Sequence, residues 1–341
     1  MRFALDGDQQ DIQRTARELL TSRVGIRQLH DFAARGRHDE ALWRELCEQG
    51  WLGVATDHEF GGLGLGTVEL VSILAELGYS LAPVPVLSTV AAATMIARAG
   101  SHEQCHRWLP LLATGEARGA LGWRDRRGTY LATDLDGAAF VIVVEGARAR
   151  LLTADEYSIT ARPSLDLSRP MFTLDPHGLG NALPGDIAEA HGMVGLALAA
   201  ESLGVARRAM DLAVEYAKIR SQYGQKIGSY QAISHRCVQM LLNVEEADAN
   251  VMYAAWCADN AADRAHAAAA VASFSGREAG WHVPASAMQV FGGIGFTWEH
   301  IIHLFLRRGR ANAALFGSSR ESTEVIADLM LDRDMAQWAV E

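Results

Sequence analysis

The chain has 341 residues, 49% of them hydrophobic and 21% charged, and its 31 Lys and Arg against 41 Asp and Glu give a net charge of −10. This composition is typical of a folded globular protein and excludes an extended disordered chain. The negative charge disfavours nucleic acid and anionic membrane surfaces as partners, because both bind proteins through their phosphates. At this length we expect two or three structural units with room for an internal cofactor cavity.

The sequence shows no segment that would direct the chain to or across a membrane. Its longest apolar stretch, residues 81–97, is interrupted near its start by Pro83 and Pro85 and is too short to span a bilayer. Asp6 and Asp8 precede any apolar run that would serve as a secretory signal. The four cysteines lack the paired spacing of a disulfide framework or a zinc site: Cys47, Cys105, Cys237 and Cys257. We therefore expect a cytoplasmic protein with reduced thiols.

The first segment, residues 1–117, is predicted to be a helical domain. Runs at 42–47 and 68–77 have the helical period of apolar residues, and the glycines of 61–66 separate them. These glycines do not follow a strand, so they fail the context of a dinucleotide-binding loop and are expected to form a turn between helices. No nicotinamide cofactor is therefore expected.

The second segment, residues 118–185, is predicted to be a small β-domain. It contains four short apolar runs separated by Asp, Gly and Pro, a pattern typical of strands: 138–144, 148–152, 157–161 and 171–174.

The third segment, residues 186–341, is predicted to be a helical bundle. One stripe of apolar residues recurs every three, four or seven positions: Met193, Leu196, Ala200, Leu203, Met210, Val214 and Ala217. A second has the same period and smaller side chains: Met240, Val244, Ala247, Val251, Ala254 and Ala258. A four-helix bundle buries both stripes. Glycines at 292–295 interrupt the pattern before another helix expected from about 298 to 314.

Histidines also occur in pairs at helical spacing, His102 with His106 and His300 with His303. No carboxylate completes a zinc-binding set beside either pair, so no metal site is expected.

Two blocks in the third segment resemble signatures of a known family. The first runs RSQYGQKI over 220–227, followed by YQAI over 230–233, and the second runs QVFGGIGFTWEH over 289–300. They are similar to the RxxFGxxI and QxxGGxGF signatures of the acyl-CoA dehydrogenase family and stand in that family's order. Weaker similarities at 51–64 and 75–78 extend the resemblance to nearly the whole chain. It implies a mainly α fold with a helical N-terminal domain, a reduced β-barrel-like middle domain and a C-terminal four-helix bundle.

The first block predicts a turn that presents Arg220, Gln222 and Tyr223 together at the end of a helix. A guanidinium offers a planar fork of donors to a pyrophosphate, the amide adds a donor, and the aromatic ring covers apolar cofactor surface. A single Arg in a turn is more commonly a solvated surface residue, so the residues alone leave both interpretations open. The resemblance implies that these three residues contact the diphosphate of FAD across a subunit interface.

The second block contains a glycine pair that admits two interpretations. Gly292 and Gly293 let a ligand approach the backbone closely, but a helix end with a tight turn explains them equally well. Gln289, one helical turn earlier, can hydrogen-bond a ribose or an adenine. The resemblance implies that Gln289 and Gly293, with Gly292 beside them, bind the adenosine half of FAD, again from a neighbouring subunit.

The resemblance also exposes a missing base. Acyl-CoA dehydrogenases remove the α-proton of a thioester with a Glu while the β-hydrogen leaves as hydride to the flavin. In most members this Glu lies in a Y-E-G-T/S segment, which falls here on 315–318 and puts Phe316 at the Glu position. The family's second location for the base falls near Val194. Structural roles are expected for Glu201 and Glu299, so no catalytic residue is assigned.

The loop that holds the flavin ring in the family is altered as well. It matches residues 120–128, which read ALGWRDRRG and contain none of the hydroxyl side chains that bind the ring in the resembling family. We therefore expect a partner chain to supply this loop.

Two interpretations account for these differences. The favoured one is the shorter subunit of a heteromeric acyl-CoA dehydrogenase, similar to those of bacterial steroid side-chain degradation. A longer homologue would then bring the base within a heterotetramer that binds FAD and an acyl-CoA and passes electrons to electron-transfer flavoprotein. The alternative is a catalytically silent paralogue that acts as a structural or binding subunit, or a flavoprotein whose chemistry needs no carboxylate.

Overall fold

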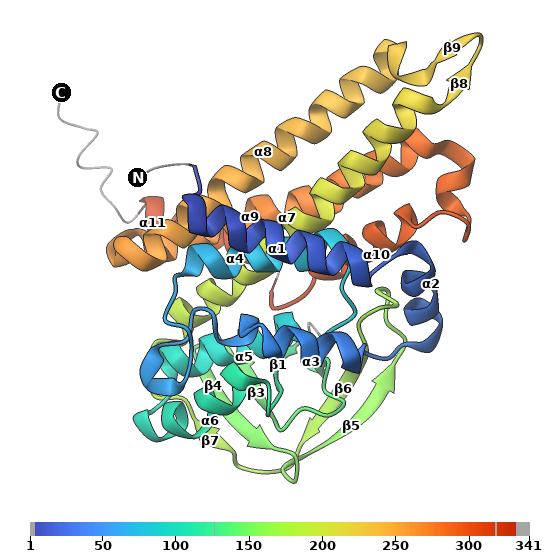
Figure 1. Ribbon diagram of the computed structural model, residues 1–341. Coiled ribbons are helices and arrows are strands. Elements are labelled where there is room, and N and C mark those ends of the chain that lie inside the picture. The colour runs from blue at the N-terminus through green and yellow to red at the C-terminus, as the bar shows by residue number, and fades with distance from the viewer. Residues whose placement is uncertain (1–3, 126, 318, 332–341) are drawn as a thin grey trace, which may run out of the picture.

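Helices dominate both ends of the chain, and a curved sheet lies between them in sequence and at one side of the molecule in space (Figure 1). The computed structural model describes residues 4–125, 127–317 and 319–331. Outside the described residues lie 1–3 of the predicted helical domain, Arg126 of the predicted flavin loop, Ser318 of the predicted base segment and 332–341 of the predicted bundle. The mainly α fold class with a smaller sheet domain is confirmed.

Within residues 4–125, six α-helices and two short 3₁₀ helices precede the sheet. They are α1 (Gly7–Arg23), α2 (Ile26–Arg35), α3 (Glu40–Glu48), η1 (Trp51–Gly53), η2 (His58–Phe60), α4 (Thr67–Ser80), α5 (Val86–Ala99) and α6 (His102–Thr114). Local sequence sets several of their ends: Asp6 with Gln9 and Ser101 with Gln104 form reciprocal capping boxes at the starts of α1 and α6. The glycines of 61–66 form a turn between η2 and α4, as expected.

The seven strands of the described sheet lie between residues 119 and 182. They are β1 (Gly119–Arg124), β2 (Tyr130–Thr133), β3 (Phe140–Glu145), β4 (Arg148–Thr153), β5 (Tyr157–Arg162), β6 (Met171–Pro176) and β7 (Asn181–Ala182), in the order β5-β6-β2-β1-β3-β4-β7. The β1–β3 pair is parallel and the other pairs are antiparallel. Alternate residues of β3 face opposite sides: Phe140 and Ile142 join the large core shared with the helices, and Val141 and Val143 join a second, smaller core.

The third segment is built on three long helices. Its elements are α7 (Ile187–Ile219), β8 (Ser221–Gln222), β9 (Gln225–Lys226), η3 (Ile227–Ser229), α8 (Gln231–Asn260), α9 (Ala262–Phe291), η4 (Gly292–Phe296), α10 (Ile302–Asn312) and α11 (Ser319–Leu331). The helix expected from about residue 298 is α10 and begins at Ile302, because residues 297–301 still form turns after η4.

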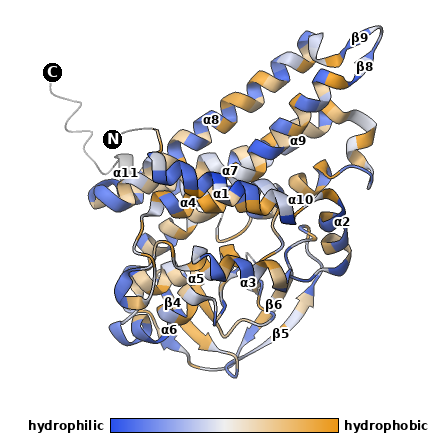
Figure 2. Ribbon diagram, in the orientation of Figure 1, coloured by the Kyte–Doolittle hydropathy of each residue, from blue (hydrophilic) through white to orange (hydrophobic). Residues whose placement is uncertain are grey.

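Helix α7 is more deeply buried than one apolar stripe predicts. Every residue from 193 to 206 is buried, because α4, α5, α9 and α10 all pack against this half of the helix. Figure 2 shows that α4, which lies against α7, is mostly hydrophobic, whereas α1 is mostly hydrophilic. On α8 the predicted stripe is buried from Met240 to Ala254, and Ala258 is partly buried.

Two glycines allow α4 and α7 to cross in backbone contact. A Cβ placed on Gly78 would lie 1.9 Å from the carbonyl oxygen of Glu201, and one placed on Gly204 would lie 1.8 Å from that of Ala75. Any side chain at either position would therefore force the helices apart.

The largest hydrophobic core joins residues of all three sequence segments. The boundaries of the domains 1–117, 118–185 and 186–341 stay a prediction, because a shared core does not mark where one domain ends and the next begins. Among the described residues, no helix is both long and apolar enough to cross a membrane.

The start of α4 depends on a residue distant in sequence. Its N-cap, Gly66, has no side chain to accept hydrogen bonds, and Asp259 at the end of α8 accepts from the backbone N–H groups of Thr67 at 2.9 Å and Val68 at 3.3 Å. We expect Asp259→Ala to lower the free energy of unfolding by about 1 kcal/mol, the usual cost of a lost N-cap. Urea unfolding measures this. The exposed Glu246 on the same helix provides the control, and an equal loss for Glu246→Ala would contradict the capping role.

His191, near the start of α7, should make the free energy of unfolding depend on pH. Burial lowers the pKa of His191 to about 4, and the nearby Arg277 adds to the shift. Burial likewise lowers the pKa of His303 to about 4. An unfolded histidine has a pKa near 6.5 and binds a proton first as pH falls, so stability is retained above pH 6.5 and lost between pH 6.5 and 4.

We expect His191→Gln to reduce the slope of unfolding free energy against pH in this range by at most about 1.4 kcal/mol per unit, the contribution of one proton. The remaining slope belongs to His303 and other groups. Unfolding curves at several values between pH 4.5 and 7 measure the slope, and identical slopes in the variant and the native chain would show that His191 does not carry the effect.

Candidate functional site

The first predicted block forms a hairpin at one end of the bundle. Helix α7 ends at Ile219, and β8 and β9 pair around a two-residue turn in which Tyr223 and Gly224 have φ of 51° and 82°. Positive φ at both central positions is the geometry of a tight hairpin turn. The hairpin is fixed to the helix by the backbone N–H of Ile227, which donates to Arg220, and by the Lys226 ammonium, which donates to the carbonyl of Ile219.

The hairpin brings Arg220, Gln222 and Tyr223 together, as the sequence predicts. They line one open hollow of about 490 Å³ whose other walls are largely aromatic and aliphatic: Tyr216, Ile227, Tyr230, Ala232, Ile233, Val290 and Phe291. The rings of Tyr216 and Phe291 lie 4.6 Å apart, and Tyr223 is 95% exposed. The Arg220 guanidinium makes no hydrogen bond or ion pair with another described residue, so its donors are available to a ligand.

The second block lies at the adjoining end of α9. Val290 and Phe291 line the hollow, but Gln289, Gly292 and Gly293 do not, and all three are solvent-exposed. Gly292 has φ 63° and ψ −139°, a conformation that favours glycine, so the helix end explains this residue. A Cβ on Gly293 would meet nothing within 4 Å, so its lack of a side chain has no cause inside the chain.

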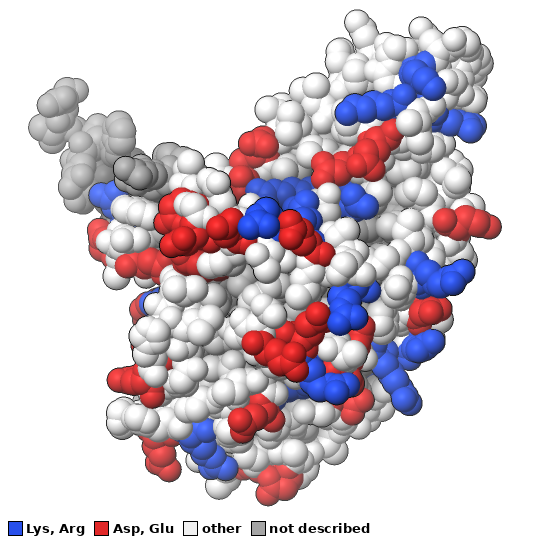
Figure 3. All heavy atoms as spheres, in the orientation of Figure 1, with Lys and Arg blue, Asp and Glu red and all other residues white. Residues whose placement is uncertain are grey.

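This tip is remote from the chain's own sheet. With 33 residues, α7 is about 50 Å long, and Figure 1 shows the hairpin at the end of the bundle that points away from the strands. On the face shown in Figure 3, Lys and Arg side chains gather at this tip. Lys218 and Lys226, the only lysines in the chain, both flank Arg220 in sequence.

At a second place the fold joins the segments that the resemblance assigns to the flavin ring and to the base. Trp123, on β1, contacts Phe316 with ring centroids 5.5 Å apart and planes at 88°. Phe316 is 2% exposed, and Val194 on α7 is fully buried. Two aromatic side chains thus fill the place where the segment assigned to the flavin ring meets the segment assigned to the base, and neither side chain can accept a proton.

Arg277, on α9, fixes the backbone that carries Phe316. Its guanidinium donates to the carbonyl oxygens of Asn312 at 3.2 Å, Leu315 at 2.8 Å and Gly317 at 3.3 Å. Phe316 has φ 53°, an uncommon value for a bulky residue that such bonds can stabilise. Burial lowers the pKa of Arg277 to about 10, which leaves the group charged at neutral pH.

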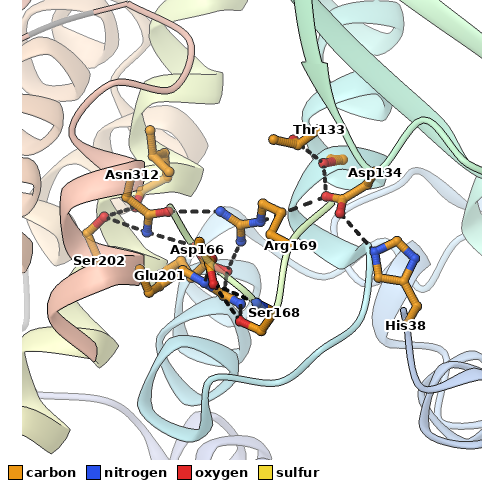
Figure 4. A network of polar contacts seen from close by, with 12 residues as sticks. His38, Thr133, Asp134, Asp166, Ser168, Arg169, Glu201, Ser202 and Asn312 are labelled. Atoms are coloured by element: carbon orange, nitrogen blue, oxygen red, sulfur yellow. Dashed lines mark hydrogen bonds and ion pairs between the residues drawn. The ribbon is translucent and has the colours of Figure 1, made fainter. Parts of the chain in front are cut away.

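Glu201 lies at the centre of a buried network of charges (Figure 4). Its carboxylate accepts from Arg169 at 2.6 Å, Arg308 at 3.0 Å and the amide of Asn312 at 2.9 Å. Arg308 also pairs with Asp166, and Arg169 lies 3.8 Å from Asp134. The network extends to His38, whose ring is 2.8 Å from Asp134, and to four hydroxyls: Ser88, Thr133, Ser168 and Ser202.

This environment makes Glu201 a poor base. Burial alone raises the pKa of a carboxyl group, but the charges of Arg169 and Arg308 outweigh it and hold the pKa of Glu201 below its usual value. Glu299, in contrast, is exposed beyond η4, and a hydrogen bond from Thr297 lowers its pKa. Glu201 thus belongs to a buried ion-pair network, and Glu299 is a surface carboxylate.

Sequence reasoning missed the partners of Glu201. Arg169, Arg308 and Asp134 belong to no motif, and the contacts of Arg308 with Glu201 and Asp166 join residues 107 and 142 positions apart. The one signal was Glu201 itself, a charge within an apolar helical stripe. In the described ranges, no three His, Cys, Asp or Glu side chains gather in a way that could hold a metal ion.

Comparison with known proteins identifies the family. Residues 6–116 match the model of the acyl-CoA dehydrogenase N-terminal domain, and residues 192–331 match that of the C-terminal domain. Acyl-CoA dehydrogenase IpdE2 of Mycolicibacterium smegmatis is 34% identical over 285 residues, which cover 83% of this chain and 86% of that protein.

Solved structures of other proteins have the same fold as this chain. The Tcur3481-Tcur3483 steroid ACAD, in a variant form, superposes with a TM-score of 0.84 at 28% identity over 95% of this chain and 98% of that one. PigA with FAD and proline has the same fold, with a TM-score of 0.86 at 20% identity over 98% of this chain and 100% of that one. The two matching blocks, the order of helices and sheet, and these likenesses agree that the chain belongs to the acyl-CoA dehydrogenase family.

Proposed function

We propose that this chain is the shorter, non-catalytic subunit of a heteromeric FAD-dependent acyl-CoA dehydrogenase. The observation that carries the non-catalytic role is the contact between Trp123 and Phe316, because it fills the place of the family's base with two side chains that cannot accept a proton. A longer homologue, in a heterotetramer, then supplies the catalytic Glu.

The tip of the bundle fits the diphosphate and adenosine end of FAD. Arg220 offers unpaired donors at the edge of a hollow with aromatic walls, and a guanidinium binds a pyrophosphate through two parallel hydrogen bonds. Gln222 and Tyr223 stand beside it, and Gln289, Gly292 and Gly293 adjoin it on α9. When bound, FAD accepts the hydride that leaves the acyl chain.

The flavin ring does not fit this chain equally well. Residues 120–125 and 127–128 place Trp123 toward Phe316, and no hydroxyl side chain stands among them. A ligand held at the tip also lies at the opposite end of the bundle from this sheet (Figure 1). These features support a ring site in the partner, with Arg220 reaching across the interface.

The two subunits then have different roles in the reaction. The partner's carboxylate removes the α-proton of an acyl-CoA, the β-hydrogen leaves as hydride, and this chain binds and orients the cofactor through Arg220. Electron-transfer flavoprotein is the proposed acceptor of the electrons, and the cytoplasm is the proposed location. Similarity to IpdE2 and to the Tcur3481-Tcur3483 steroid ACAD supports a steroid-derived acyl group. The two protein names in the second of these support a heteromer.

A silent structural or binding subunit remains the second candidate. Phe316 and Trp123 favour it equally. The unpaired Arg220 favours the cofactor-binding subunit instead, because it places guanidinium donors at the edge of a hollow with aromatic walls.

The tip residue Arg220 provides the first functional test. In the complex with the longer homologue, Arg220→Ala removes a charge-assisted contact worth about 1.5 to 3 kcal/mol and should weaken FAD retention roughly ten- to hundredfold. Flavin absorbance after dilution and gel filtration measures retention. Arg148→Ala, an exposed change on β4, is the control.

Amine labelling of the same complexes, read by mass spectrometry on the peptides of this chain, checks that the tip is covered, since Lys218 and Lys226 are the only lysines of this chain. Unchanged flavin retention in Arg220→Ala, with both lysines protected, would contradict the assignment.

The missing base provides the second test. The chain purified alone should not dehydrogenate any acyl-CoA, because loss of a general base typically costs 10²- to 10⁴-fold in rate. Co-expression with a longer homologue that carries the Glu should restore activity, measured with an artificial electron acceptor.

Turnover by the isolated chain that is lost in a Glu201→Gln or Glu299→Gln variant shown to be folded by circular dichroism would assign the base to one of those residues and overturn the proposal. A complex that forms and retains flavin equally well in Arg220→Ala and in the native chain would favour the silent structural subunit.

A further inference from the structure

A second hollow lies between the N-terminal helices and α7. Its volume is about 140 Å³, and its walls come from α4, α5, α6, the start of α7 and the segment 52–60. Neither the tip residues nor Trp123, Phe316 and Val194 line it. No residue that the sequence analysis assigns to the cofactor or to the position of the base lines it.

Small side chains keep the hollow open. Ala93, Thr94 and Ala97 of α5 face Met193, Leu196 and Ala197 of α7 across it. Helix interfaces are ordinarily filled to the density of organic crystals, and one larger aliphatic residue on α5 would close this one.

The outer wall is held rigidly by backbone hydrogen bonds. Leu63 donates to Gly53, Gly64 to Thr56 and Leu65 to Val54, each at 2.9 Å. Because of these bonds, the glycine-containing turn cannot collapse into the hollow without losing backbone pairing. The space is therefore a fixed feature of the fold.

The interior is mostly apolar and the entrance is charged. Phe60, Leu70 and Val71 are among the apolar lining residues. At the entrance Asp57 and Arg98 line the hollow, and Arg98 is 3.5 Å from Glu189. Asp57 and Arg98 are the charged residues of the lining, and the ion pair with Glu189 offsets the charge of Arg98, so the uncompensated charge is the negative one of Asp57, which disfavours carboxylates and the phosphates of a CoA thioester.

We infer that this hollow binds a small uncharged molecule of hydrocarbon character, about the size of a six-membered ring. A dry cavity of about 150 Å³ is known to accept benzene, and the volume here is similar. Apolar walls bind the ring by burial, while the rigid outer wall spares the cost of ordering the site.

The site is independent of the proposed reaction centre. On α7, the lining residues Met193, Leu196 and Ala197 follow one side of the helix, whereas Val194, Leu198 and Glu201 follow a side about 100° away. Binding therefore requires neither FAD nor a partner subunit, and the inference does not rest on the proposed function.

The test uses cyclohexanol and its anionic counterpart cyclohexanecarboxylate as probes. Saturation-transfer NMR on the full chain should give a Kd of about 1 mM for cyclohexanol, the order expected of a seven-atom ligand. The carboxylate should bind at least fivefold more weakly because of the charge at the entrance.

Filling the hollow provides the matched variant. Ala93→Leu should weaken cyclohexanol binding at least tenfold, and Thr94→Leu provides the same test if the first variant does not fold. Ala34→Leu, an exposed alanine of α2 that does not line the hollow, should bind like the native chain.

Absence of cyclohexanol binding, or binding unchanged in both filled variants, would overturn the site. Equal affinity for the carboxylate would overturn the uncharged class of ligand. Flavin retention in the heteromer should be the same in Ala93→Leu and the native chain, so failure of this inference is distinguishable from failure of the proposed function.

Discussion

The buried carboxylate of Glu201, held between the guanidinium groups of Arg169 and Arg308, is the interaction on which the rest of the structure depends. It joins the middle of α7 to the loop between β5 and β6 and to α10, and Asp134 and His38 extend it to the sheet and the N-terminal helices. Removal of one member of such a buried pair leaves an uncompensated charge in a low-dielectric interior, which typically costs 3 to 5 kcal/mol. The three sequence segments are therefore tied by electrostatics as well as by their shared apolar core.

Helix α7 carries this restraint to the tip. The network fixes the helix at Glu201, the glycine contacts at Gly78 and Gly204 fix it against α4, and about five turns later the helix ends at Arg220. A continuous helix transmits its orientation along its axis, so the position of the Arg220 backbone follows from contacts made near the sheet. A cofactor site that lies between two chains needs this rigidity, because neither chain holds the whole ligand.

The sequence predicted the tip better than the interior. Arg220, Gln222 and Tyr223 are close in sequence, and a helix end followed by a glycine-containing turn brings them together by local geometry alone. The contact of Trp123 with Phe316 joins residues 193 positions apart, and neither residue shows a pattern that reveals the other. The network around Glu201 escaped prediction for the same reason, and because charged residues outside motifs are usually solvated. Local periodicity likewise gave α7 one apolar stripe, whereas packing on several sides buries residues 193–206 completely.

The loop at Phe316 shows how a reaction centre can be lost without loss of the fold. Arg277 binds the backbone carbonyls of Asn312, Leu315 and Gly317, so these hydrogen bonds hold the loop by its backbone and not by the side chain at position 316. A carboxylate there would be buried, because Phe316 is 2% exposed, and burial of an unpaired charge is costly. The Phe316 ring adds no charge and packs against Trp123. Under the proposed function, an aromatic residue in place of the base closes the centre and keeps the loop, and the tip of α7 acts on a cofactor whose ring lies in the partner subunit.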